Sequence, residues 1–171
     1  MDMMKFYDIT HREHEVCNPS SASKLESVIE LLRLPPGAQV VDIACGKGEF
    51  LIRMAKAYDV RGLGIDISPF HIAAASRRLE ERVGSSGVAF TVMDGAEYRP
   101  DSPSSLDVAS CIGASWVFGG HAGTLDTLRA MVKPGGWVLV GEPFWRQEPS
   151  PEYLDALGLS RQDFGTHFSN A

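Results

Sequence analysis

The chain has 171 residues, of which 44% are hydrophobic and 22% charged, and its formal net charge is −6. This length fits one domain with a sizeable core. The sequence contains no apolar run of about 18 residues that could span a membrane. The net negative charge disfavours binding to DNA and RNA because it repels phosphate backbones. Cys17, Cys45 and Cys111 are odd in number and far apart, which argues against a disulfide framework and a paired metal site and favours a reducing cytoplasm.

The N-terminal region, residues 1–34, is expected to be helical. Residues 1–10 mix charges and aromatics and contain no apolar signal sequence, so no export is expected. From residue 20 onward, apolar Leu25, Ile29 and Leu32 recur at helical spacing after capping serines, and two prolines and a glycine follow. This pattern predicts an amphipathic helix that precedes the first strand.

The core, residues 38–143, alternates strands with helices. The predicted strands are 39–44, 60–66, 87–94, 105–112 and 137–144, and the predicted helices are 50–59, 68–84 and 121–136, the last ending at a glycine pair. Because such alternation requires each crossover to return over a parallel sheet, we expect a doubly wound, mostly parallel Rossmann-like α/β fold with helices on both faces. The tail, 147–171, predicts two short helical pieces and no strand.

Carboxylates mark the ends of several predicted strands. Asp42, Asp66, Asp94 and Asp107 lie at or beside such positions, and ligands of open parallel sheets bind beyond the carboxyl ends of the strands. Asp66 stands 24 residues after Asp42 at the end of the next strand, where a carboxylate can accept two ribose hydroxyls.

Each of these residues also has a structural explanation. Asp42 can stabilise the glycine turn, Gly46 and Gly48 can serve the turn alone, Asp66 can cap the next helix, and Asp94 can stabilise a strand-end turn. Together the turn and Asp66 indicate a nucleoside site.

The segments "VVDIACGKGEF" (40–50), "GLGIDIS" (62–68), "VMDGAEY" (92–98), "SLDVASCIGAS" (105–115) and "MVKPGGWVLVGEP" (131–143) resemble the successive motifs of class I S-adenosylmethionine-dependent methyltransferases. The resemblance implies that S-adenosylmethionine is the cofactor and S-adenosylhomocysteine the product. It implies these cofactor-binding residues: Asp42, Ala44, Cys45, Gly46 and Gly48 around the methionyl and ribose portion; Asp66 at the ribose hydroxyls with Ile67 beside the adenine; Asp94, Gly95 and Ala96 at the adenine edge; Cys111 and Ile112 near the sulfonium.

Two features depart from the family pattern. Ala44 stands where the first of three alternating glycines is usual, a substitution that the family tolerates. The family fold continues into a further helix and a C-terminal antiparallel strand pair, and no such pair is visible here. A fragment, a shortened chain and an edge supplied by a partner all remain open, as does a homo-oligomer.

A dinucleotide site is the main rival. The dinucleotide fingerprint needs a third glycine where Leu51 stands, and Glu49 places a negative charge at the helix start, where a pyrophosphate would bind. A sulfonium cation is compatible with that charge.

The acceptor side of the site is less defined by the sequence. His11, His14 and His121 are candidate bases, although each also suits a surface or packing role, and His71 is expected to be half-exposed. Residues 4–16 resemble the lid helices that small-molecule methyltransferases fold over the cofactor, which implies that residues 1–34 form an N-terminal helical lid. The candidate substrate-binding residues are Phe6, Tyr7, Trp116 and Phe118. The alternative for Phe6 and Tyr7 is that they anchor the helix on the core, and the alternative for Phe118 is packing under the next helix. No metal site is expected.

These observations predict a methyltransferase that modifies a small organic molecule, since methyl transfer chiefly requires that nucleophile, methyl group and sulfur be held in line. The signature of nucleic-acid amino-methylating members is replaced by "SCIGASW", so nucleic acid is not expected as a partner, nor is a membrane. The alternative is a catalytically silent or truncated S-adenosylmethionine-binding module that acts with a partner chain.

Overall fold

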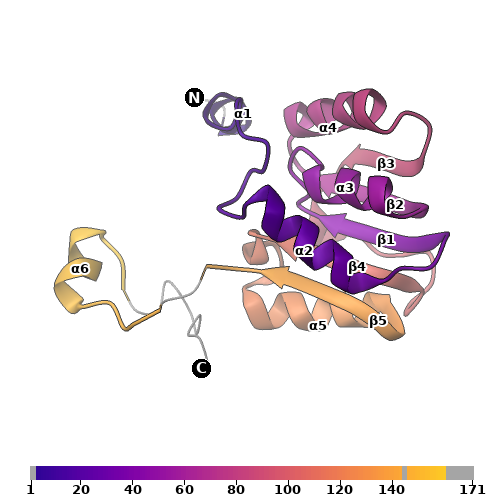
Figure 1. Ribbon diagram of the computed structural model, residues 1–171. Coiled ribbons are helices and arrows are strands. Elements are labelled where there is room, and N and C mark those ends of the chain that lie inside the picture. Colours follow the sequence, from indigo (N-terminus) through magenta and orange to yellow (C-terminus); the bar gives the residue numbers. More distant parts are fainter. Residues whose placement is uncertain (1–2, 144–145, 161–171) are drawn as a thin grey trace.

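The structure is a computed structural model that describes residues 3–143 and 146–160 (Figure 1). Its centre is a parallel five-stranded sheet of order β3-β2-β1-β4-β5. The strands are β1 (Ala38–Ile43), β2 (Val60–Asp66), β3 (Gly87–Val92), β4 (Leu106–Ile112) and β5 (Val132–Gly141). The strand order reverses between β1 and β4, which places the topological switch point in the middle of the sheet.

Helices cover both faces of the sheet, as the strand–helix alternation predicts. One face carries α2 (Ala22–Leu32), α3 (Glu49–Ala57) and α4 (Pro69–Arg82), and the other carries α5 (His121–Met131) (Figure 1). The core residues divide accordingly. Leu25, Ile52 and Met54 belong to the first layer, and Ile43 and Leu128 to the second.

Local sequence signals set the beginnings of two of these helices. The Ser21 hydroxyl accepts from the backbone N–H of Lys24, and the Ser68 hydroxyl accepts from that of His71, so that both serines are N-caps. Pro69 takes the first helical position, where its missing N–H costs nothing.

The predicted boundary between the last core helix and the last strand is wrong. The helix α5 ends at Met131 instead of running to residue 136, and β5 begins at once with Val132. Pro134 lacks an N–H and forces the preceding residue away from helical geometry, while Gly135 has a φ of +82°. The register of the pairing between β4 and β5 shifts between Leu106 and Val108, at this irregular start of β5.

The remaining elements are short. They are α1 (Met3–Thr10), η1 (Gly95–Glu97), η2 (Ser115–Phe118) and α6 (Pro151–Ala156). Past β5, the described residues contain α6 and no strand. Residues 1–2 of the N-terminal region, residue 144 of the last predicted strand and residues 161–171 of the tail lie outside the described residues. No helix in the described ranges is long and apolar enough to cross a membrane.

Candidate cofactor site

A turn of unusual backbone geometry leaves the carboxyl end of β1. Ala44, Gly46 and Gly48 have φ values of +55°, +55° and +74°, in the left-handed region that favours glycine. A Cβ on Gly48 would lie 2.5 Å from the ring of Phe90. Gly48 is therefore required both by its conformation and by close packing against β3.

Asp66 fastens this turn to the end of β2. One carboxylate oxygen accepts from the backbone N–H of Gly46 at 2.9 Å, and the other accepts from that of Ser68 at 2.8 Å. Asp66 does not itself cap α4, because the N-cap is Ser68, but its carboxylate holds the N–H of that cap residue as well as the turn. Each oxygen still has room for another donor, and Asp66 borders the cavity described below.

Asp42 is a buried carboxylate behind the turn, with 3% of its surface exposed. Ser110, the neighbour of Asp42 on β4, donates a hydrogen bond of 2.7 Å to it. Burial raises the pKa of Asp42 to about 7, the Ser110 hydrogen bond opposes that rise, and the charge of Asp66 adds to it. Asp42 is therefore suited to a cationic ligand, which would favour its ionised form.

Asp94 and Asp107, the other two carboxylates at or beside the predicted strand ends, lie at opposite edges of the sheet. Asp94 follows β3 and accepts from the backbone N–H of Ala96 at 2.9 Å, so it stabilises the turn into η1. Asp107 lies near the start of β4, where it accepts from the backbone N–H of Gln39 and pairs with Lys133. Since Gln39 and Asp107 are near the amino ends of their strands, Asp107 belongs to the opposite edge of the sheet.

The N-terminal segment is held over the turn by polar contacts. Lys47 is 5% exposed, and its ammonium group donates to the backbone carbonyls of His11 and Arg12 at 2.5 and 2.8 Å. Arg78 donates to the carbonyls of Glu15 and His14. Since no residue of α1 is buried, these hydrogen bonds contribute to the attachment of its C-terminal end.

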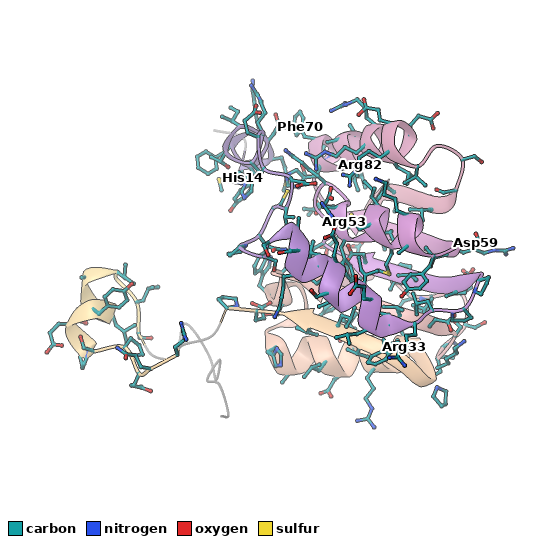
Figure 2. All side chains as sticks on the ribbon, viewed as in Figure 1. His14, Arg33, Arg53, Asp59, Phe70 and Arg82 are labelled. Atoms are coloured by element: carbon teal, nitrogen blue, oxygen red, sulfur yellow. The ribbon has the colours of Figure 1, made fainter. Side chains whose placement is uncertain are left out.

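A cluster of charges centred on Glu49 reinforces this attachment. Glu49 is 3% exposed and accepts from Arg53 at 2.6 Å and from Arg82 at 2.6 and 2.9 Å, while Arg53 also pairs with Glu15 and Glu26. Figure 2 shows Arg53 and Arg82 on the face of the sheet that carries α2, α3 and α4. Burial opposes ionisation of Glu49, but the hydrogen bonds and charge of Arg82, with the charge of Arg53, outweigh it and lower its pKa.

These elements surround a cavity of about 630 Å³, a size typical of small-molecule sites. It lies at the carboxyl ends of β1, β2 and β4, and α1 and the segment after it also contribute to its lining. The sequence-predicted residues that line it are Tyr7, His11, Asp42, Ala44, Cys45, Gly46, Asp66, Ile67, Asp94, Gly95, Ala96, Ile112 and Trp116.

Six candidate residues are not among the lining: Phe6, His14, Gly48, Cys111, Phe118 and His121. Cys111 has no exposed surface, and burial raises the pKa of its thiol to about 12. Phe118 packs against the core layer beneath α5, which was the alternative that the sequence allowed. His121 begins α5 at the surface.

The cavity also contains residues that the sequence analysis missed. Val16, Cys17 and Asn18 line it from the segment between α1 and α2, and Asn18 donates to the carbonyl of Ile112 at 3.1 Å. Lys47 and His71 line it as well. The expectation that His71 is half-exposed is wrong, because only 12% of its side chain is accessible. No sequence pattern signals these residues, since their contacts span long stretches of chain.

Comparison with known proteins places this chain in a family. A family model described as "Methyltransferase domain" matches residues 40–136. The chain therefore belongs to the methyltransferases, and its fold is that of the class I S-adenosylmethionine-dependent group.

One relative resembles the chain over most of its length. YjhP of Escherichia coli is 39% identical over 161 residues, which cover 94% of this chain and 64% of that protein. The crystal structure of YjhP superposes with a TM-score of 0.83, covering 91% of this chain and 63% of that one.

A methyltransferase from Thiobacillus denitrificans, solved in complex with S-adenosyl-L-homocysteine, is 39% identical with a TM-score of 0.83, covering 93% of this chain and 64% of that one. A trans-aconitate 2-methyltransferase of Methylobacterium nodulans is 36% identical over 123 residues, or 70% of this chain and 45% of that protein. The chain thus spans less than two thirds of the length of these relatives.

Proposed function

We propose that this chain binds S-adenosylmethionine in the cavity at the carboxyl edge of the sheet and transfers its methyl group to a small organic acceptor. The observation that carries the proposal is the arrangement of Asp42, the glycine turn and Asp66 around one cavity. The relative solved with S-adenosyl-L-homocysteine supports the cofactor, and the trans-aconitate relative supports a small acceptor.

The residues around the cavity fit this cofactor in size and charge. A volume of about 630 Å³ suits a molecule of this size, and the buried Asp42 offers a negative charge to a cation. Asp66 has free lone pairs for ribose hydroxyls, and the turn at Asp94, Gly95 and Ala96 would meet the adenine edge. When bound, the cofactor supplies an electrophilic methyl group.

The chain's own contribution to the reaction would be to orient the reactants and exclude water. The segment Val16, Cys17 and Asn18, held in place through Lys47, closes one side of the cavity. Trp116 is 74% exposed and lines the cavity, so we assign it to the acceptor side, where its ring can stack on a substrate. Of the candidate bases, His11 alone borders the cavity.

Calorimetry with S-adenosylmethionine and S-adenosylhomocysteine tests cofactor binding. A methyl-transfer assay over a panel of small carboxylic acids, amines and phenols then tests turnover. We expect micromolar binding of both cofactor forms and transfer to at least one acceptor class. Binding without transfer to any acceptor would instead favour a silent module, and the absence of binding would refute the proposal.

A further inference from the structure

Trp116 is a largely exposed aromatic side chain that borders the cavity. It belongs to η2, is 74% exposed and lines the cavity, and Tyr7 of α1, which is 43% exposed, lines it as well. Aromatic rings can hold an apolar group by stacking and a cation by its attraction to the ring face. The rings alone therefore do not define the charge of an acceptor, which depends on the polar groups around them.

The strongest hydrogen-bond donors of the cavity are already engaged. Among the described residues of the lining, Lys47 is the only lysine or arginine. Its ammonium group donates to the carbonyls of His11 and Arg12, and the side-chain amide of Asn18 donates to the carbonyl of Ile112. An anionic acceptor would therefore have neither a free ammonium nor a guanidinium group to replace its hydration.

Hydrogen-bond acceptors, by contrast, remain available in the cavity. Asp42, Asp66 and Asp94 line it and accept from hydroxyl or backbone N–H groups. In the described part of the chain, no lysine or arginine forms an ion pair with these three aspartates. Each carboxylate has about four lone-pair sites, so each keeps some of them free. The two glutamates of the lining, Glu15 and Glu49, are paired with arginines instead.

The ring of His11 adds another acceptor to the lining. Its Nδ1 lies 3.1 Å from the carbonyl oxygen of Tyr7. A carbonyl oxygen only accepts, so this contact places the proton of the neutral ring on Nδ1 and leaves a lone pair on Nε2. Unlike the two ring nitrogens of His71, Nε2 of His11 is not enclosed, and it can accept a hydrogen bond from a ligand.

We infer that the acceptor of this site is a small amine with an apolar body, which binds as an ammonium ion with that body against Trp116. The inference rests on the proposed function and adds the substrate class. An ammonium group only donates hydrogen bonds, which matches the free acceptors of the cavity. A carboxylate or phosphate only accepts, and the cationic donor that it requires is engaged. Negative charges that line a cleft also raise the local concentration of cations.

Ligands of similar shape and different charge test this inference. Calorimetry would measure the Kd of 2-phenylethylamine, 2-phenylethanol and 3-phenylpropionate for the protein saturated with S-adenosylhomocysteine, so that the adenosyl part of the cavity is filled. We expect the amine to bind about tenfold more tightly than the alcohol, and the carboxylate at least about tenfold more weakly than the alcohol. Added salt should weaken the binding of the amine and leave that of the alcohol unchanged.

Variants then identify the residues that bind the amine. Trp116→Ala should raise the Kd of the amine about fivefold, and Trp116→Phe should retain part of the affinity because a phenyl ring attracts cations less strongly than an indole. The control is Trp137→Ala, since Trp137 is 44% exposed on β5 and lies outside the lining; it should leave every Kd unchanged. His11→Phe should raise the Kd of the amine about fivefold without weakening the carboxylate.

Several outcomes would overturn the inference while the proposed function stands. They are a carboxylate that binds as tightly as the amine, an alcohol that does so, an unchanged amine Kd in Trp116→Ala, and no amine binding to the protein loaded with S-adenosylhomocysteine. In the methyl-transfer assay, transfer to carboxylic acids but not to amines would also overturn it. If the wild type binds no S-adenosylhomocysteine, the proposed function fails and this inference fails with it.

Discussion

Arg82, the last residue of α4, donates two hydrogen bonds to the carboxylate of Glu49, the first residue of α3, at 2.6 and 2.9 Å. This bidentate pair joins the two helices that flank β2. Glu49 also begins the helix that follows the glycine turn, so the same carboxylate fixes the geometry at the cavity edge.

Glu49→Gln is expected to destabilise the fold by about 3 kcal/mol, because removal of one member of a buried ion pair leaves the arginines without a counter-charge. Urea unfolding measures this loss. The control is Glu26→Gln, whose side chain is 55% exposed and also pairs with Arg53; it should cost less than about 0.5 kcal/mol. Equal effects of the two substitutions would contradict the central role of Glu49.

The contribution of Glu49 to stability should depend on pH. Its pKa is lowered in the folded protein, so the stabilisation is fully present above the ordinary pKa of a glutamate, near 4.3, and is lost as pH falls through the lowered value. Melting curves of the wild type and Glu49→Gln should therefore converge in acid. Parallel curves over the whole range would show that the carboxylate is not ionised in the fold.

Lys47→Met is expected to release α1 while leaving the sheet intact, because the ammonium group holds the carbonyls at the end of a helix that has no buried residue. Hydrogen exchange should accelerate at least about tenfold for residues 3–14 and remain unchanged in β1 and β4, since the loss of local hydrogen bonds lowers local stability. Lys56→Met, at an exposed position near the end of α3, is the control. Unchanged protection of α1 would mean that other contacts hold it.

Ala44→Gly should stabilise the protein by up to about 1 kcal/mol. A left-handed conformation costs a residue with a Cβ about 1–2 kcal/mol, and the greater flexibility of glycine in the unfolded chain offsets about half of that gain. Urea unfolding compares it with Ala73→Gly in the middle of α4, an exposed helical position where about 1 kcal/mol should be lost. If both substitutions lowered the free energy of unfolding, the positive φ of Ala44 would not be a source of strain.

The sequence predicts the layout of the sheet because strand–helix alternation is a local pattern that each segment carries by itself. The range 60–66 matches β2 residue for residue, and Asp42, Gly46 and Asp66 all border the cavity. The family resemblance depends on these same segments, and the family comparison confirms it.

The contacts that hold the N-terminal segment could not be predicted in this way. Lys47 reaches carbonyls 35 and 36 residues earlier, and His71 lies beneath a helix that begins near the start of the chain. Lysine between two glycines suggests an exposed turn, and histidine near a helix start suggests a half-exposed surface. Lys47 and His71 are buried because residues 3–18 fold over them, and the sequence around each residue does not show this.

The ionisation of Asp42 provides a further test of the cofactor site. With a pKa raised to about 7, the neutral form of Asp42 is favoured below pH 7 in the ligand-free protein. Its contribution to stability is fully present below the ordinary pKa near 4 and is lost as pH rises through 7. A cation in the cavity favours the ionised form, so binding below pH 7 must release a proton. The affinity for S-adenosylmethionine should therefore fall by up to about tenfold per pH unit below 7.

Calorimetry at pH 5.5 and pH 8 measures this dependence, with 5′-methylthioadenosine, which lacks the sulfonium and the amino-acid group, as the neutral control ligand. Asp42→Asn should weaken S-adenosylmethionine binding at pH 8 and abolish its pH dependence, while the neutral ligand should be indifferent to both changes. The raised pKa comes from the buried position of Asp42 behind the turn, and the hydrogen bond from Ser110 opposes it. If Asp42→Asn kept the wild-type pH profile, another group would control the charge of the site.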